Sequence, residues 1–413
     1  MSSFAPIQGR DTEGRGEAVQ ARNHSGDSLR HLPALDGLRG VAITLVLAHN
    51  FDIIGAPRGM WAHAVDVALN VGWIGVQLFF VLSGFLITRI LLHTQDSANY
   101  FAGFYGRRIL RIFPLYYGTL LVAFVILPLL VKLPTGFAQE QAHQAWLWLY
   151  LSNTSNTFGF ESQVFPHFWS LAIEEQFYLL WPLIVHRRSP FQVLRLCLAI
   201  AVLSALVRVA LLLHGTDVHA VYSMTFCRMD ALAMGAAVAA LLKVPGASVY
   251  ACAHRKRMAW GALALLVGGF VVTHGYPRTS YLDQTIGYSW LAFAFALAVL
   301  VVVSGDSVGG RRSKWEQMLS LTSLRTLGKY SYSMYVFHKP LHDWVGVPIL
   351  TALGLFPEPN STVAVIYFLA STAITLLLGA ASYHLIEKHF IGLKRLFVAE
   401  VRRPVSPATD TRR

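Results

Sequence analysis

The chain has 413 residues, of which 54% are hydrophobic and only 14% charged, and its formal net charge is +12. Because about a quarter of an average soluble domain is charged, this composition excludes a soluble nucleic-acid-binding protein, whose basic residues would cover a surface. It also excludes a disordered chain, which lacks the apolar residues for a core. Ten Trp and sixteen Tyr are typical of the aromatic belts of a multi-pass membrane protein.

Residues 1–30 are polar and show no signal-peptide pattern, so we predict a disordered cytoplasmic tail. From residue 34 onward, ten apolar segments approach the length of about 20 residues that a spanning helix needs. They cover approximately 34–53, 70–92, 114–131, 168–186, 191–213, 220–242, 258–274, 285–304, 330–353 and 362–386. An eleventh stretch, 142–151, is too short to cross and is predicted to be re-entrant or interfacial.

The positions of Lys and Arg predict the topology, because cytoplasmic loops carry an excess of positive charge. Ten spans, with 142–151 left out of the count, place every basic cluster on one side and both termini in the cytoplasm. The segment 100–114 alternates aromatic residues with arginines before a span, which favours an interfacial helix. Its arginines either anchor that helix among the lipid headgroups or bind phosphate.

The predicted spans contain ionisable side chains, which are costly in hydrocarbon and usually functional. These residues are Arg39, His49, Glu174, Glu175, Arg208, Arg228, Asp230, His338, Lys339, His342 and Asp343. The three cysteines, Cys197, Cys227 and Cys252, lack the spacing of a zinc site or a disulfide scaffold. The sequence therefore predicts no metal site.

Six strings in the chain resemble, in the same order, those of the acyltransferase 3 family of integral membrane acyltransferases, which includes O-antigen and other cell-envelope O-acetylases. The strings are LDGLRGVAITLVLAHN from Leu35, FFVLSGFLITRIL from Phe79, RRILRIFPLYY from Arg107, HFWSLAIEEQFYLLWP from His167, FCRMDALAMGAAVA from Phe226 and GKYSYSMYVFHKPL from Gly328.

The resemblance covers about residues 31–392 and implies an all-α membrane domain of ten helices there, in the bacterial inner membrane. Residues 393–413 are expected to be a basic cytoplasmic tail, and no soluble esterase-like domain is expected. The implied activity moves an acyl group, acetyl by default, from cytoplasmic acyl-CoA to a hydroxyl of an envelope saccharide or lipid-linked glycan. Acyl-CoA would be a co-substrate and not a bound cofactor. The sequence identifies neither the acceptor nor the oligomeric state.

The family signature in the first span is an Arg or Lys, ten residues and a His. Here nine residues separate Arg39 from His49, and Asn50 occupies the expected position. Ten steps leave Arg39 and His49 about 80° apart around an ideal helix, so either the helix is locally irregular or His49 is not equivalent. We favour His49, because only an imidazole acts as a base near neutral pH.

Transfer of an acyl group from a thioester to an alcohol needs a base, stabilisation of the oxyanion and anchors for the CoA phosphates. We predict that His49 is the general base, oriented by Glu174 or Glu175. Glu174 is preferred, because adjacent helical residues point about 100° apart and only one can face the histidine. The predicted acyl-CoA-binding residues are Arg39, Arg107, Arg108 and Arg111. The predicted cavity-lining residues are Ser83, Trp169, Arg228, Asp230 and His338.

Several alternatives stay open at this point. Arg228 could form an ion pair with Glu174 or Glu175, and Arg228 and Asp230 either make structural pairs or line the substrate path. Ser83 and Gly84 either permit a close helix approach or supply a cavity hydroxyl. Direct transfer and a covalent acyl-enzyme both fit. A secondary transporter or flippase is the alternative function, although the chain lacks the paired Gly/Pro-interrupted segments of inverted repeats.

Overall fold

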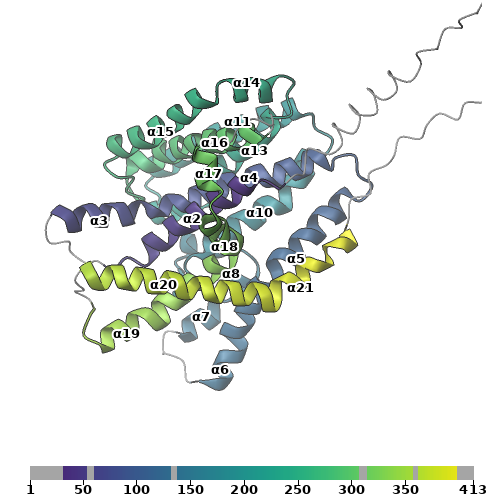
Figure 1. Cartoon of the computed structure of the whole chain (residues 1–413). Coiled ribbons are helices and arrows are strands. Elements are labelled where there is room, and N and C mark those ends of the chain that lie inside the picture. Colours follow the sequence, from purple (N-terminus) through teal and green to yellow (C-terminus); the bar gives the residue numbers. More distant parts are fainter. Residues whose placement is uncertain (1–30, 54–59, 132–136, 307–313, 357–360, 398–413) are drawn as a thin grey trace, which may run out of the picture. The chain divides into compact units, whose positions relative to one another are not determined.

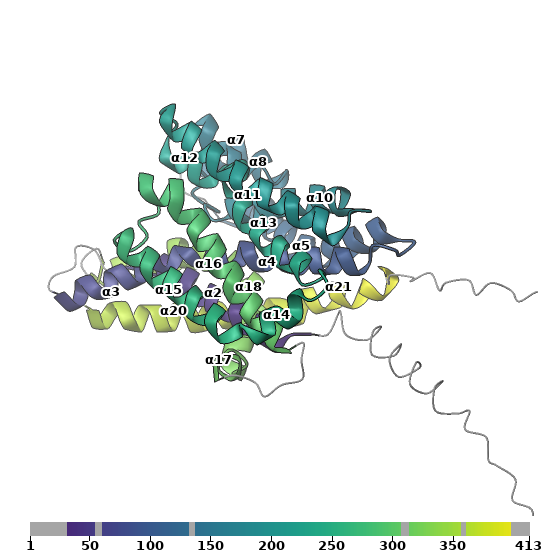
Figure 2. The same cartoon turned by 90° about the horizontal axis from the view of Figure 1, so that it is seen from above.

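The computed structural model describes residues 31–53, 60–131, 137–306, 314–356 and 361–397, and the fold described here is that of the unit 33–413. Every regular element in the described residues is a helix (Figures 1 and 2), which confirms the all-α prediction. The predicted tail at 1–30 and most of the predicted tail at 393–413 lie outside these residues. The ten longest described helices are α2 (Pro33–Asn50), α4 (Ile74–His93), α5 (Tyr100–Leu121), α10 (Phe168–Val185), α11 (Pro190–Leu213), α13 (Thr225–Leu241), α15 (Arg255–Val272), α16 (Tyr288–Asp306), α18 (Thr322–Leu341) and α20 (Ser361–Ser382).

Each of these ten helices overlaps one of the ten predicted spans, although α5 and α18 begin well before theirs. In the described part of the chain, six helical segments are long and apolar enough to cross a membrane: Val65–His93, Tyr100–Leu130, Pro190–Leu213, Val218–Leu241, Asp283–Gly305 and Thr362–Phe397. The other four predicted spans correspond to α2, α10, α15 and α18, whose sequences carry more polar or charged side chains. The protein is thus a multi-pass helical bundle, and the count of ten crossings stays a prediction.

Basic loops meet in pairs at the helix ends. Gln95, which follows α4, donates to the backbone carbonyl of Arg188, just before α11, at 2.8 Å. Arg255, at the start of α15, forms an ion pair of 2.7 Å with Glu316 in the short helix α17 (Lys314–Leu319). These contacts join loops that the charge distribution assigns to one side. Which side of the membrane they face is still a prediction.

The helices α4 and α13 cross at unusually short range. A Cβ atom at Gly84 would overlap the carbonyl oxygen of Leu232, and one at Gly235 would overlap that of Val81. Only a residue without a side chain allows the two backbones to approach so closely. The prediction that Gly84 permits a close helix approach is therefore confirmed.

The prediction of a separate interfacial helix over 100–114 is wrong. The helix α5 continues through η2 (Val122–Ile126) and α6 (Leu127–Leu130), so that Tyr100–Leu130 is one segment of 31 residues. At 1.5 Å per residue it is about 46 Å long, more than the roughly 30 Å of the hydrocarbon core. The arginine-containing part is therefore one end of a long helix, and not a helix lying on the surface.

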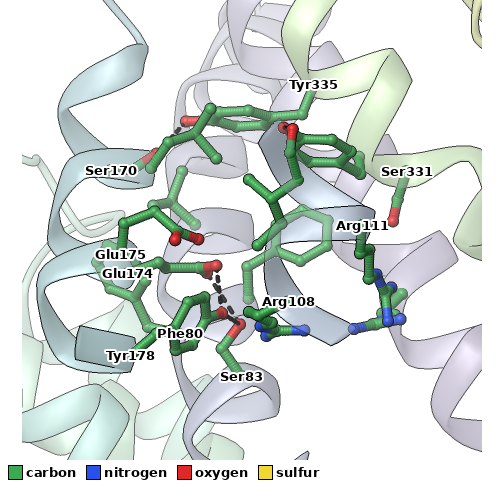
Figure 3. Close-up of a pocket in the computed structure, with 16 residues that line it drawn as sticks. Phe80, Ser83, Arg108, Arg111, Ser170, Glu174, Glu175, Tyr178, Ser331 and Tyr335 are labelled. Atoms are coloured by element: carbon green, nitrogen blue, oxygen red, sulfur yellow. Dashed lines mark hydrogen bonds between the residues drawn. The ribbon is translucent and has the colours of Figure 1, made fainter. Parts of the chain in front are cut away.

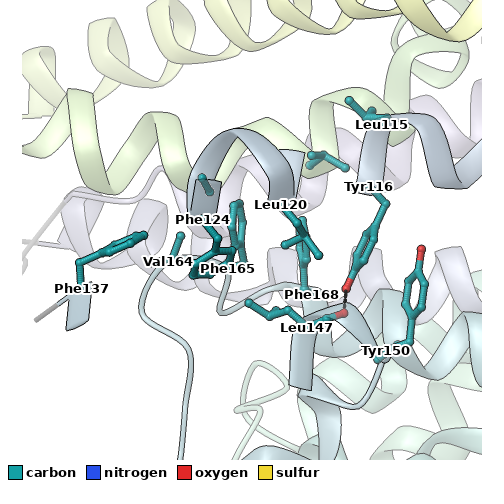
Figure 4. Close-up of a cluster of buried hydrophobic side chains, with 13 residues drawn as sticks. Leu115, Tyr116, Leu120, Phe124, Phe137, Leu147, Tyr150, Val164, Phe165 and Phe168 are labelled. Atoms are coloured by element: carbon teal, nitrogen blue, oxygen red, sulfur yellow. Dashed lines mark hydrogen bonds between the residues drawn. The ribbon is translucent and has the colours of Figure 1, made fainter. Parts of the chain in front are cut away.

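The segment between α6 and α10 folds into short helices, including α7 (Phe137–His143), α8 (Ala145–Trp148) and α9 (Ser152–Ser155). The stretch 142–151 contains the end of α7, α8 and turns, and none of these helices is long enough to cross a membrane, which agrees with its exclusion from the predicted spans. An aromatic cluster holds the segment against α5 (Figure 4). The Tyr116 ring stacks on Tyr150 at 4.2 Å and on Phe168 at 4.9 Å, and its hydroxyl donates to the carbonyl of Leu147 at 2.8 Å. This packing fixes the start of α10.

A buried ion pair joins α11, α13 and α16. Nη2 of Arg208 lies 2.9 Å from the carboxylate of Asp230, and both side chains are fully buried. Ser289 donates to the same carboxylate at 2.7 Å, and Arg208 also donates to the backbone carbonyl of Gln284 at 2.7 Å. Charges removed from water persist only when they are paired and hydrogen-bonded. Asp230 is thus half of a structural pair, one of the two alternatives that the sequence left open.

Candidate active site

Two cavities lie in series along the bundle, and α2, α4, α10 and α18 contribute to both. The inner cavity has a volume of about 80 Å³ and is lined by Arg39, Val76, Phe79, Phe80, Ser83, Arg108, Arg111, Ile112, Ser170, Leu171, Glu174, Glu175, Tyr178, Ser331, Tyr332 and Tyr335. The outer cavity has a volume of about 600 Å³ and is lined by Val46, His49, Asn50, Asp52, Trp73, Val76, Glu161, Gln163, Pro166, His167, Trp169, His219, Tyr222, Ser223, Arg278, Tyr335, Lys339, His342 and Asp343.

The order of lining residues along the helices sets this arrangement. On α2, Arg39 lines the inner cavity and His49 the outer, and ten residues of helix separate them by about 15 Å. On α10, Trp169 lines the outer cavity and Glu174 the inner. Because every shared helix passes from one cavity to the other, the cavities are stacked along the helix axes.

Three arginines gather at the inner cavity, which two carboxylates also line. Arg39 of α2 lines the cavity. Arg108 and Arg111 of α5 lie opposite the carboxylates of α10 in Figure 3. The ion pairs within 4.0 Å among the described residues involve none of these three arginines. Lys394, in η7 (Leu393–Phe397), lies close enough to Arg108 and Arg111 to repel them. Such a cluster is suited to a phosphate group, which arginine binds through paired hydrogen bonds.

Glu174 organises the opposite wall of the inner cavity (Figure 3). Ser83 donates to one carboxylate oxygen at 2.9 Å, and Tyr178 donates to the other at 2.6 Å. The Tyr178 ring in turn lies under the Arg108 guanidinium, 4.1 Å from the ring centre. Glu175 lines the same cavity and takes part in no ion pair among the described residues. The Glu174 network therefore positions Arg108 through a tyrosine ring.

The outer cavity combines aromatic rings with hydrogen-bonding groups. Trp73, Trp169 and Tyr222 supply flat faces, with Trp169 and Tyr222 in contact at 4.7 Å between ring centres. Lys339 and Asp343, on its rim, form an ion pair of 3.2 Å. Aromatic faces beside carboxylates and amides give a ligand both apolar contact and oriented hydrogen bonds. This surface is suited to a polar, ring-shaped ligand such as a sugar.

His49 and Asn50 both line the outer cavity, and their surroundings differ. The Asn50 amide donates to the carbonyl of Val46 in its own helix at 2.9 Å. Nδ1 of His49 is buried without a hydrogen-bond partner. The helix α2 runs regularly from Pro33 to Asn50, without the local irregularity that the spacing suggested. None is needed, because Arg39 and His49 line different cavities. The geometry favours His49 over Asn50 as the candidate base.

The structure does not bring His49 and Glu174 together. His49 is the second-last residue of α2, whereas Glu174 is about 9 Å inside α10, level with Ser83 of α4. Both Glu174 oxygens accept hydrogen bonds from Ser83 and Tyr178. The sequence placed the two at the same depth, because it could not show how far α10 is shifted relative to α2.

Of the other predicted site residues, some line one of the two cavities and the rest lie outside both. Ser83 lines the inner cavity and Trp169 the outer. Arg107 donates to the backbone carbonyl of Phe397 and is absent from the inner-cavity lining. His338 is fully buried, with Nδ1 2.6 Å from the carbonyl of Tyr335, and lines neither cavity.

Arg228 and Asp230 also lie outside both cavities. Arg228 donates to the Gln77 side chain at 2.7 Å and sits among aromatic rings, the nearest being Tyr288 at 4.4 Å. Its partner is thus neither Glu174 nor Glu175. Among the described residues, no group of three or more His, Cys, Asp and Glu side chains is arranged to hold a metal ion.

Sequence reasoning missed Tyr178, Tyr335 and Lys394. The two tyrosines resemble ordinary packing residues in the sequence, and only the fold shows them between charged or polar groups. Lys394 belongs to a basic segment that the sequence explains by topology alone. Arg278 lines the outer cavity, 5.4 Å from the centre of the Tyr222 ring, and was missed because it is a lone cation in a loop otherwise free of positive charge.

The structure is a helical membrane bundle with a cation-lined cavity and a histidine-containing cavity in series. Comparison of its sequence with protein families identifies the class to which it belongs. Residues 32–380 match the Acyltransferase domain family, and the chain is a member of that family. The match extends from α2 to near the end of α20 and so includes every lining residue of both cavities. The resemblance carried by the six strings is therefore confirmed.

The chain is similar to several bacterial O-acetyltransferases. It is 28% identical over 375 residues to the peptidoglycan O-acetyltransferase OatA of Listeria monocytogenes, covering 87% of this chain and 56% of the relative. It is 26% identical over 374 residues to the O-acetyltransferase OatA of Staphylococcus aureus (87% and 57%), and 29% over 381 residues to the putative peptidoglycan O-acetyltransferase YrhL of Bacillus subtilis (88% and 56%). The chain thus spans little more than half the length of these relatives. No solved structure matches the chain.

Proposed function

We propose that this protein transfers an acetyl group from acetyl-CoA to a hydroxyl of a cell-wall glycan. The observation that carries the proposal is the series of two cavities. One gathers three arginines that form no ion pair within 4.0 Å among the described residues, and the other contains a histidine with an uncommitted ring nitrogen. The family supports acyl transfer, and the names of the relatives support a peptidoglycan-like acceptor.

The inner cavity is the proposed donor site. Arg39, Arg108 and Arg111, which form no ion pair within 4.0 Å among the described residues, would bind the phosphates of acetyl-CoA. The cavity volume of about 80 Å³ is too small for the nucleotide, so the arginines would hold the phosphates at the end of the cavity near Lys394, and the thioester would lie beyond them toward Tyr335. The nucleotide would therefore remain on the side of the basic loops, with Lys394 near its phosphates. The small volume favours acetyl over a long acyl chain.

The outer cavity is the proposed acceptor site, and His49 the proposed general base. The acceptor hydroxyl gives its proton to His49 while its oxygen bonds to the thioester carbonyl carbon. The C–S bond then breaks, the CoA thiolate leaves, and the proton finally resides on CoA. The products are an acetyl ester of the glycan and free CoA. Glu174 acts in this scheme as a positioning residue of the donor site, through Tyr178 and Arg108, and not as the partner of His49.

The topology supports this division of roles. The inner cavity lies toward the helix ends that carry the basic loops, which the positive-inside rule assigns to the cytoplasm, where acyl-CoA is made. The outer cavity would then open toward the cell envelope, where a glycan acceptor is found. Both termini would be cytoplasmic, and a reporter fused to either end, active only in the cytoplasm, tests that orientation.

The direct test uses purified protein with acetyl-labelled acetyl-CoA and soluble peptidoglycan fragments. We expect one free CoA for each labelled ester on the glycan. His49→Ala should lower transfer by about 10²- to 10⁴-fold, the usual contribution of a general base, whereas Asn50→Ala should leave most of the activity. Ion-coupled uptake of a solute without thioester turnover would instead support a transporter.

A further inference from the structure

Two residues line both cavities: Val76 of α4 and Tyr335 of α18. We call this pair the dividing wall. Both side chains are almost buried, with 8% and 7% of their surface exposed. The donor and acceptor cavities are thus separated by two side chains, of which Tyr335 is the larger.

Contacts from both sides fix the Tyr335 side chain. Its hydroxyl lies 2.6 Å from Oγ of Ser170, which lines the inner cavity (Figure 3), and donates to the backbone carbonyl of His167 at 3.1 Å. Its ring makes edge contacts with Phe79 of the inner cavity at 6.3 Å and with His167 of the outer cavity at 5.3 Å. Tyr335 is therefore held across the boundary and not within either cavity.

Unpartnered polar atoms gather beside the dividing wall. Nδ1 of His167 and Nε2 of His338 are buried without a hydrogen-bond partner, and both rings contact the Tyr335 ring, at 5.3 and 5.2 Å between centres. Nδ1 of His49 is likewise buried without a hydrogen-bond partner. Buried polar atoms are nearly always hydrogen-bonded in a folded protein. His49 and His167 line the outer cavity, so polar atoms of a ligand bound there can supply the missing partners of these two nitrogens, whereas His338 lines neither cavity.

We infer that Tyr335 is a gate between the donor and acceptor cavities, and that the acetyl group crosses at its position. This inference rests on the proposed function. The thioester carbon and the acceptor oxygen must approach within about 3–3.5 Å to react, and the dividing wall is the boundary that the two cavities share. In the absence of an acceptor, the Tyr335 ring keeps water in the outer cavity away from the thioester. Such water would bond to the carbonyl carbon and break the C–S bond, giving acetate and CoA.

The test compares hydrolysis with transfer in three variants. Tyr335→Ala removes the ring, so acetyl-CoA hydrolysis without acceptor should rise about tenfold, equivalent to about 1.4 kcal/mol of barrier. The share of consumed acetyl-CoA recovered as glycan ester should fall. Tyr335→Phe keeps the ring, so its hydrolysis should stay near the wild-type rate. Tyr330→Ala is the matched control, because Tyr330 is a nearly buried tyrosine of the same helix, 3.1 Å from His384 and outside both cavities.

The outcomes separate the gate from the function. If Tyr335→Ala is not recovered as a monodisperse protein, Tyr335→Leu should show a smaller rise in hydrolysis. A folded Ala or Leu variant with wild-type hydrolysis and a wild-type share of ester would overturn the gate while leaving the proposed function intact. A rise in hydrolysis of equal size in Tyr330→Ala would also overturn the gate, because a general loss of packing in the bundle would then explain the hydrolysis. If the wild-type protein makes no ester from acetyl-CoA, the proposed function fails first.

Discussion

Arg208 and the three arginines of the inner cavity have opposite surroundings in this bundle. Arg208 is fully buried, paired with Asp230 at 2.9 Å and further bonded to Ser289 and to backbone carbonyls. Arg39, Arg108 and Arg111 reach a cavity from two helices and have no carboxylate within 4.0 Å in the described part of the chain. Arg208 has its partners within the protein, whereas the three cavity arginines form no ion pair among the described residues and face Glu174 and Glu175 across the cavity.

This difference separates structure from function among residues that look alike in the sequence. Arg39 and Arg208 lie in predicted spans, where a charge is costly, and Arg108 and Arg111 come just before one. A charge whose partners all come from the protein contributes to the fold. A group of like charges that repel one another lowers stability until an anion binds. Replacing members of the two groups should therefore have opposite effects on stability.

The largest effect on stability is expected when the complete pair is broken. Asp230→Ala leaves the Arg208 charge buried without its carboxylate, which costs about 3–5 kcal/mol. Thermal unfolding in detergent should show a much lower midpoint, or the protein should not accumulate. Asp343→Ala is the control, since its pair with Lys339 is partly exposed and contributes about 0.5 kcal/mol or less. Equal losses of stability in the two variants would show that the buried Arg208–Asp230 pair contributes no more than the exposed pair.

Replacement of an inner-cavity arginine should weaken donor binding without lowering stability. Arg111→Met removes one charge-assisted contact to phosphate, about 1.5–3 kcal/mol, so the Kd for CoA should rise roughly 10- to 150-fold. The unfolding midpoint of the free protein should stay unchanged or rise, because repulsion by Arg39 and Arg108 is relieved. Calorimetric titration with CoA and thermal unfolding measure the two quantities. A destabilised Arg111→Met with normal CoA affinity would place Arg111 among the structural arginines.

A smaller effect is expected from Glu174→Gln. The amide oxygen still accepts one hydrogen bond, from Ser83 or Tyr178, but the second acceptor becomes a donor. Tyr178 should then hold Arg108 less firmly, and the KM for acetyl-CoA should rise about tenfold, equivalent to about 1.4 kcal/mol. The kcat should change less, because Glu174 is not beside His49. A loss confined to kcat would instead restore Glu174 as the partner of the base.

The smallest effect is expected from Arg107→Met. Arg107 bonds to the backbone of Phe397 and lies outside the inner-cavity lining, although its neighbour Arg108 lines that cavity. The Kd for CoA should therefore change less than about fivefold, or under about 1 kcal/mol. A loss as large as that of Arg111→Met would extend the donor site to the outer face of α5.

The sequence predicted the helices well and the contacts between them poorly. All ten predicted spans are helices because apolar length is a local property, and the short stretch 142–151 was correctly left out of the count. The helix at 100–114 was misassigned because arginines near a membrane surface occur both in interfacial helices and at the ends of long spans. The predicted site residues that line the cavities include Ser83, Trp169, Arg39, Arg108 and Arg111.

The pairing of His49 with Glu174 failed for a different reason. It depends on the axial shift between α2 and α10, which no local pattern encodes. The role of Asp230 depended likewise on the side chain of Arg208, which lies 22 positions earlier in the preceding long helix. Tyr335 could not have been selected from the sequence, because its significance lies in the two cavities that it separates.

The central claim is that donor binding and base catalysis are divided between two cavities, and one pair of variants tests it. CoA affinity and acetyl transfer should be measured on the same preparations of His49→Ala and Arg111→Met. We predict that His49→Ala binds CoA as tightly as the wild-type protein and transfers almost no acetyl, whereas Arg111→Met binds CoA weakly and recovers transfer at high acetyl-CoA. Loss of CoA binding in His49→Ala, with normal binding in Arg111→Met, would contradict this division.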